Sequence, residues 1–333
     1  SKKFTDNPTV FNRTQKEMEK TLNRLIPGKL SWKKINRNYK NEPVIEGTYK
    51  SDDGDKYKMH IVWDTYNNVT GNSDTYFCPS FYMLGEKSDK EHISAVISGL
   101  QADIDDIKTD YTNMIEKNVG TYKKAVEELI GRKINDEYRM CSLNAKSAKI
   151  INDTQSIELK YNGKQYDLLA FYKDVDNLKF SDIDPGYQVK ADEKPDKWAK
   201  TTSAGNDHLS SMYDTSVYLV FCEGKLEYIE ADSFRETGSV YKNEQKIISP
   251  NKALKEVIKF YEKKLLVDEV KIKSIELQYA AYYASDSSKT VKPVITPVWL
   301  VGVYDNEESI ERIAYFCYDG YTGECYGNEI IPW

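Results

Sequence analysis

Apolar positions recur every three or four residues in four segments of this 333-residue chain, and that spacing predicts amphipathic helices. These segments cover residues 11–26, 93–114, 122–130 and 253–265. Pro27 and Gly28 end the first helix, Gly131 ends the third, and Pro250 begins the fourth. The pattern therefore predicts long helices near residues 92–131.

Between the helices the pattern changes to short β-rich runs. Asn162-Gly163 predicts a hairpin across residues 156–172, and Glu223-Gly224 predicts another across residues 217–231. Helices and strands follow one another without regular alternation. The fold class expected is α+β, with antiparallel sheets covered by helices.

In the C-terminal third, a change in the parity of the apolar positions predicts a β-bulge near Ser274. Residues 190–207 have no apolar period and are expected to be a linker. We therefore expect an N-terminal α+β domain at residues 1–195 and a C-terminal α+β domain at residues 205–333. Each half contains a Tyr-x-x-x-Thr-Gly turn, and this leaves open whether the N-terminal half is a diverged repeat of the C-terminal half.

The composition limits the class of protein. Hydrophobic residues make up 40% of the chain and charged residues 30%, which is typical of a globular protein with a core. The net charge of −6 argues against nucleic acid as a partner, because phosphate binding needs a basic surface. No run of about 18 apolar residues occurs, so no membrane span is expected.

The five cysteines include one close pair, Cys317 and Cys325, and no Cys-x-x-Cys motif. A symmetrical hairpin centred on Thr322-Gly323 would not place these two residues opposite each other. Free, buried thiols are expected, and the alternative of a disulfide stays open.

Catalytic and cofactor motifs are missing from the sequence. The three histidines are far apart, and the acidic clusters at residues 51–57 and 174–186 do not have the spacing of a calcium-binding EF-hand loop. We therefore predict no catalytic residue, no metal and no cofactor. Two alternatives remain: a secreted hydrolase of glycan or peptide with two carboxylates not identified by the sequence, and a glycan-binding module that uses some of the 26 tyrosines.

The C-terminal quarter carries a resemblance. The segments "SPNKALKEVIKFYEKKLL", "VKIKSIELQYAAYY", "ITPVWLVGVYD" and "IAYFCYDGYTGECY" are similar to the PepSY-like module of the YycH and YycI regulatory lipoproteins of Gram-positive bacteria, and to uncharacterised clostridial lipoproteins. The similarity covers about residues 249–327. Its last hairpin has the pattern D-A-x-T-G-E, in which Gly320 replaces the alanine.

The resemblance implies an extracytoplasmic protein, at the cell surface or secreted, without catalysis of its own. It implies that the protein binds a protein partner or a cell-wall component and modulates a sensor kinase or a peptidase. The polar start at Ser1 fits a chain from which a signal has been removed, with a lipid anchor at the N-terminus as the membrane attachment. The alternative of a piece of a cytoplasmic protein stays open.

The shared turn is expected to be structural. Gly323 allows a positive φ angle, and Asp319 can cap the loop. The earlier "YNNVTGN" is expected to form the same turn. The residues assigned to the turn motif are Asp319, Gly320, Tyr321, Thr322, Gly323, Glu324, Thr70 and Gly71.

Overall fold

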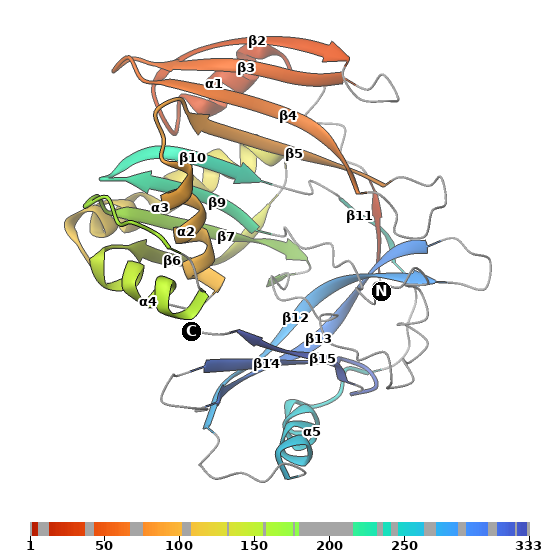
Figure 1. Cartoon of the computed structure of the whole chain (residues 1–333). Coiled ribbons are helices and arrows are strands. Elements are labelled where there is room, and N and C mark those ends of the chain that lie inside the picture. Colours follow the sequence, from red (N-terminus) through yellow and green to blue (C-terminus); the bar gives the residue numbers. More distant parts are fainter. Residues whose placement is uncertain are drawn as a thin grey trace.

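The structure is a computed structural model with two antiparallel sheets and five helices among its described residues (Figure 1). It describes residues 2–5, 13–36, 43–66, 76–101, 108–131, 133–155, 158–175, 177–179, 216–231, 236–240, 246–262, 271–285, 291–305, 312–323 and 325–331. The α+β class predicted from the sequence is confirmed.

The larger sheet has nine strands, and all of its pairings are antiparallel. In spatial order its strands are β2 (Gly28–Asn36), β3 (Pro43–Ser51), β4 (Lys56–Tyr66), β5 (Tyr76–Gly85), β10 (Lys225–Ala231), β9 (Ser216–Cys222), β7 (Tyr166–Val175) and β6 (Ile134–Leu143), with β8 (Leu178–Lys179) beside β7. Four helices pack on it: α1 (Gln15–Leu22), α2 (Lys90–Gln101), α3 (Asp110–Ile130) and α4 (Ala145–Gln155).

The smaller sheet has six strands. Its order is β11 (Glu236–Val240), β1 (Lys2–Thr5), β13 (Val291–Asp305), β14 (Arg312–Asp319) and β15 (Cys325–Ile331), and β12 (Lys271–Ser285) pairs with β13. Helix α5 (Pro250–Glu262) packs Ala253, Val257 and Tyr261 against this sheet. The helix begins at Pro250, as predicted.

The two sheets do not divide at the expected linker. Strands β9 and β10 follow residues 195–205 in the chain, yet they pair with β7 and β5 of the larger sheet. Strand β1, at the start of the chain, pairs with β13 of the smaller sheet. The boundary between residues 195 and 205 therefore does not coincide with the boundary between the sheets, and it stays a prediction as a proteolytic site.

The larger sheet has an apolar core on each side. Helices α1 and α3 cover one face along most of the sheet, and α2 and α4 cover the other face over β6, β7 and β9, with Leu84 of β5 and Tyr228 of β10 at the margin of that core (Figure 1). Strand β7 is buried on both faces, because Leu169 and Phe171 enter the first core while Leu168 and Ala170 enter the second. This explains the unbroken apolar run in its sequence.

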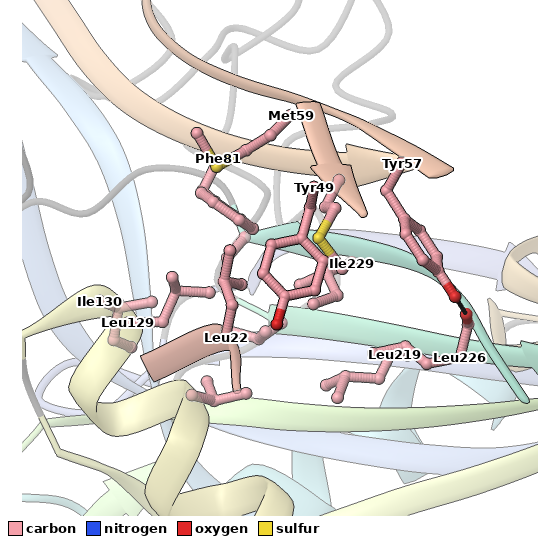
Figure 2. Close-up of a cluster of buried hydrophobic side chains, with 14 of the residues drawn as sticks. Leu22, Tyr49, Tyr57, Met59, Phe81, Leu129, Ile130, Leu219, Leu226 and Ile229 are labelled. Carbon is pink, nitrogen blue, oxygen red and sulfur yellow. Dashed lines mark hydrogen bonds between the residues drawn. The ribbon is translucent and has the colours of Figure 1, made fainter. Parts of the chain in front are cut away.

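The first core brings α1, α3 and both halves of the larger sheet together. Figure 2 shows Leu22 of α1 and Leu129 of α3 beside the ring of Tyr49, which lies on β3. The hydroxyl of Tyr57 donates a hydrogen bond of 3.0 Å to the carbonyl oxygen of Leu226 on β10. Burial of apolar side chains from both ends of the sheet makes it one packing unit.

The predicted hairpin at Asn162-Gly163 is wrong. Residues 158–165 make a turn, with Gly163 at φ 81°, but they form no strand, because β7 already pairs with β6 on one edge and with β9 on the other. The side-chain amide of Asn152 supplies the hydrogen bonds that a neighbouring strand would make with Leu159. It accepts from the N–H of Leu159 and donates to the carbonyl oxygen of Leu159, both at 2.9 Å.

The predicted helix over residues 93–114 is also wrong in its extent. Thr109 is the N-cap of a new helix, α3, and its hydroxyl accepts the N–H of Thr112. Helix α3 then runs through Gly120 and ends at Gly131, which has φ 70° as expected for a C-cap glycine. Helix α4 was not predicted.

Two local predictions are confirmed. Strands β9 and β10 form a hairpin through Glu223 and Gly224, whose φ angles are 48° and 80°. The register of β12 against β13 shifts between Ile272 and Ser274, where the bulge was expected.

Polar side chains from α1 and its C-cap cover the free edge of β2. Gln15, Glu19 and Asn23 are spaced four residues apart. Asn23 bonds both the N–H and the carbonyl of Gly28, at 2.8 and 3.0 Å. Glu19 accepts the N–H of Leu30 at 2.8 Å, and Gln15 donates to the Leu30 carbonyl at 2.6 Å. The edge strand thus has hydrogen-bond partners where a further strand would lie.

A buried carboxylate joins α3 to the larger sheet. Asp167 of β7 is fully buried, and its Oδ1 accepts from Thr112 at 2.9 Å, from Gln165 at 2.8 Å and from the hydroxyl of Ser142. The carboxylate also lies close to the N-terminus of α3, where the helix dipole favours a negative charge.

Candidate binding face

Among the residues that the structure describes, no helix packs on the face of β2–β4 opposite α1, and we call this face, together with Tyr82 and Leu84 of β5, the open face. Its outward-pointing residues are Lys29, Ser31, Lys33, Ile35, Val44, Glu46, Thr48, Lys50, Lys56, Lys58, His60, Tyr82 and Leu84. Those on β2–β4 are exposed, except Ile35, Glu46 and His60, which are half-buried, and Val44, which is buried. The same strands bury their alternate residues in the first core.

A row of titratable and aromatic side chains crosses the open face. Glu46, His60, Tyr82 and Glu230 are directly opposite one another on β3, β4, β5 and β10. Adjacent strands are about 4.8 Å apart, so the backbones of Glu46 and Glu230 are about 14 Å apart. In glycoside hydrolases the paired carboxyl groups lie about 5–9.5 Å apart, which is closer than these two backbones.

A row of three lysines crosses the open face near the turn between β3 and β4. Lys29, Lys50 and Lys56 are directly opposite one another on three neighbouring strands. Like charges at directly opposite positions destabilise a sheet. The adjoining turn is acidic, and its Asp55 Oδ2 lies 3.5 Å from Lys225 Nζ. Repulsion within the lysine row therefore lowers the stability of the fold, and a strand surface that is merely solvated would not need such a row.

The open face ends at a step. Leu84 of β5 and Tyr228 of β10 continue outward from the sheet and pack against the second core, which α2 covers. A helix with its side chains is about 10–12 Å across, so α2 stands well above the sheet. The open face is therefore a floor bounded on one side by α2 (Figure 1).

A buried histidine cluster lies under the start of α2, at a position where no site was predicted. His92 is 3% exposed. Its Nε2 accepts the backbone N–H of Asn162 at 3.1 Å, and its Nδ1 lies 2.9 Å from Asp89 Oδ2. The Tyr166 ring stacks on the imidazole with the ring centroids 5.2 Å apart.

The polar contacts of this cluster assign it a structural role. Nε2 of His92 is an acceptor in use, so the ring proton is on Nδ1 and faces Asp89. Burial raises the pKa of Asp89, but the hydrogen bonds from His92 and Asn162 together bring it below its ordinary value. Burial also raises the pKa of the neighbouring Cys222 thiol. The cluster fixes the turn at Asn162 onto α2.

The predicted C-terminal turn has the expected backbone geometry. Asp319 Oδ1 accepts the N–H groups of Tyr321 at 2.8 Å and of Thr322 at 2.7 Å. Gly323 has φ 77°, as predicted. Glu324, Thr70 and Gly71 lie outside the described residues.

The same turn holds the segment that precedes α5. The N–H of Ile248 donates to the carbonyl of Gly320 at 2.7 Å, and the indole N–H of Trp299 donates to the carbonyl of Ile248 at 3.0 Å. A Cβ atom on Gly320 would lie 2.6 Å from the carbonyl oxygen of Pro297. This contact explains why glycine stands where the resembling pattern has alanine.

Cys317 and Cys325 are not joined by a disulfide bond. Cys317 is buried, whereas Cys325 is exposed and lies opposite Tyr318. The register agrees with the prediction that the two cysteines do not face each other.

The residues that the structure describes offer neither a metal-binding group nor a membrane-spanning helix. These residues contain no group of three or more histidine, cysteine, aspartate or glutamate side chains that could hold a metal ion. Within the same residues, no helix has the length and apolar character needed to cross a membrane.

The comparisons with known proteins concern the fold alone. No protein-family model matches the chain, and no curated protein matches it. The crystal structure of an uncharacterized protein from Eubacterium rectale aligns with a TM-score of 0.56 at 15% identity, over 98% of this chain and 84% of that chain. The Bacillus megaterium YpeB C-terminal domain aligns with a TM-score of 0.43 at 10% identity, over 96% and 97% of the two chains.

Proposed function

We propose that the protein acts outside the cytoplasm, without catalysis, by binding a protein partner or a cell-wall component through the open face. The observation that supports this proposal most directly is the lysine row. Lys29, Lys50 and Lys56 are exposed and opposite one another, at a cost in stability that bound negative charge would offset.

The location and the regulatory role rest on the resemblance of residues 249–327 to the PepSY-like module of YycH- and YycI-type lipoproteins. In this proposal the C-terminal module, with α5 and the turn after Asp319, modulates a sensor kinase or a peptidase. Its turn is well suited to a scaffold, because Asp319, Gly320 and Gly323 all serve backbone geometry.

The proposal is tested by photocrosslinking from the open face in intact cells. A photoreactive amino acid is placed at Thr48, which is exposed at the centre of the open face. The control carries the same amino acid at Lys124, which is exposed on α3. We expect crosslinks to a protein or to wall material from residue 48 and none from residue 124.

Equal crosslinking from both positions, or none from residue 48, contradicts the assignment of the open face. The location is read separately, from protease accessibility of the protein on intact cells. Protection equal to that of a cytoplasmic marker contradicts the extracytoplasmic proposal and leaves the binding face unaffected.

A further inference from the structure

We infer that the open face binds a linear polyanion whose charges are backbone phosphodiesters. This inference rests on the proposed function, because it names the ligand of the same face. The evidence is the charge, the chemistry and the shape of the floor formed by β2, β3 and β4.

The charge of this floor is opposite to that of the whole chain. Five exposed lysines, at positions 29, 33, 50, 56 and 58, stand there against Glu46, whereas the chain as a whole has a net charge of −6. Lys29 also forms an ion pair with α1, because its Nζ lies 3.6 Å from Glu19 Oε1 at the sheet edge. The other four lysines point away from α1, and they form the part of the floor that we assign to the ligand.

The side-chain chemistry favours phosphate groups over a protein surface. Every cation on this floor is a lysine, which attracts phosphate as a mobile point charge and does not require a fixed, two-point geometry. From Lys29 to Lys33, Glu46 to Lys50 and Lys56 to His60, every outward position is polar, and the apolar outward residues Ile35 and Val44 lie beyond this stretch. Protein interfaces are depleted in lysine and have apolar or aromatic anchors at the centre.

The shape of the floor favours a chain-like ligand over a membrane. Helix α2 rises beside the floor at β10, and the acidic turn from Asp52 to Asp55 borders the lysine row. A flat anionic membrane would meet the helix and the acidic turn together with the lysines. A single polymer strand can lie on β2–β4 without contacting either border.

The polymer is expected to lack nucleobases. Single-stranded nucleic acids bind proteins through aromatic side chains on which the bases stack, in addition to basic groups. The floor of β2–β4 presents lysine, serine, threonine, glutamate and histidine at the outward positions just defined. The nearest tyrosine on the open face, Tyr82, is on β5.

The test measures binding of a fluorescent synthetic oligo(glycerol phosphate) to the full chain by anisotropy at several salt concentrations. The floor variant replaces four lysines by glutamine: Lys33→Gln, Lys50→Gln, Lys56→Gln and Lys58→Gln. The control variant makes the same change in net charge at four exposed lysines on α3 and α4: Lys117→Gln, Lys124→Gln, Lys146→Gln and Lys149→Gln.

We expect the floor variant to bind about a hundredfold more weakly at low salt, and the control variant to bind within about threefold of the unchanged protein. The slope of log K against log salt should be about −3 for the unchanged protein and much shallower for the floor variant, since about four phosphate contacts are removed. Circular dichroism confirms that both variants are folded.

Several results would overturn the inference. These are no binding of the oligomer, equal weakening in both variants, tighter binding to an oligothymidylate, and tighter binding to vesicles that contain phosphatidylglycerol. Each is distinguishable from failure of the proposed function. If crosslinks from residue 48 reach a protein while the oligomer does not bind, the binding face stands and the assigned ligand is wrong.

Discussion

One row of residues across the larger sheet shows how its two halves differ. Starting at the β2 edge, the row passes through Thr48 and Lys58, then Leu84 and Tyr228, and ends at Val220 and Leu168. The first pair is exposed, the second half-buried and the third buried. The strands are similar in geometry, so the change in side-chain character follows the helices that cover one half and not the other.

A single antiparallel sheet can therefore bury one part of a face in a core and expose another part of the same face to solvent. On β7 and β9, both faces contribute to stability, because α2 and α4 lie over the outward side. On β2–β4, the inward face contributes to the core, and the outward positions from Lys29 to Lys33, Glu46 to Lys50 and Lys56 to His60 carry polar and charged side chains.

The largest effect is expected at the buried end of this row. Leu168→Ala should lower the free energy of unfolding by about 2–5 kcal/mol, because it opens a cavity between β7 and the helices above it. Thr48→Ala, at the other end of the row, should cost less than about 1 kcal/mol. Urea unfolding measures both, and equal costs at the two ends would contradict the distinction.

The carboxylates of Asp167 and Glu46 test the same contrast between the buried and the exposed half of the sheet. Asp167→Ala should cost about 1–3 kcal/mol, because it leaves the donors of Ser142, Thr112 and Gln165 without their acceptor. Glu46→Ala removes a carboxylate from the open face and should have little effect on the urea midpoint. A silent Asp167→Ala would show that water replaces the acceptor.

Acid should weaken the covered half through Asp89. Its pKa in the folded protein is below the ordinary 3.8, so its ionised form stabilises the fold above that pH, and this contribution is lost as the pH falls through the folded-state pKa. Asp89→Asn keeps an acceptor for His92 and removes the titration. Between neutral pH and about pH 3, the variant should therefore lose less stability than the unchanged protein in parallel urea titrations. Identical losses would exclude this contribution.

The smallest effect expected is a gain. Lys50→Thr removes the central charge of the lysine row and should raise the urea midpoint slightly at low salt, because Lys29 and Lys56 then have no like charge directly opposite. The gain should vanish at high salt, where exposed charges are screened. A lower midpoint at low salt would mean that the row is stabilised by contacts within the fold.

The sequence predicted the features that depend on local geometry. The hairpin at Glu223-Gly224, the bulge before Ser274, the start of α5 at Pro250 and the positive φ of Gly323 each follow from what one or two residues require. The α+β class followed in the same way from periodicity. These predictions needed no knowledge of which strands are neighbours.

The predictions that failed needed that knowledge. Asn162-Gly163 has the same local signal as Glu223-Gly224, yet no hairpin forms there, because both edges of β7 are occupied. The open face could not be predicted from the sequence either, because Lys29, Lys50 and Lys56 come together only through strand register. The contact of His92 with Asn162 joins residues 70 positions apart, and neither residue carries a signal of the other.

The hydrogen bonds between α1 and β2 also determine how the molecule can change in length. An α-helix turns by about 100° per residue, so deletion of one residue between Gln15 and Glu19 would move one of these side chains away from the strand edge. Substitutions at Lys16 and Lys20, which are exposed, leave that alignment intact. The segment should therefore accept changes of residue far more readily than insertions or deletions. A shifted helix would leave Gly28 and Leu30 to pair with a strand of a neighbouring molecule, and the sheet would then grow from one chain into the next.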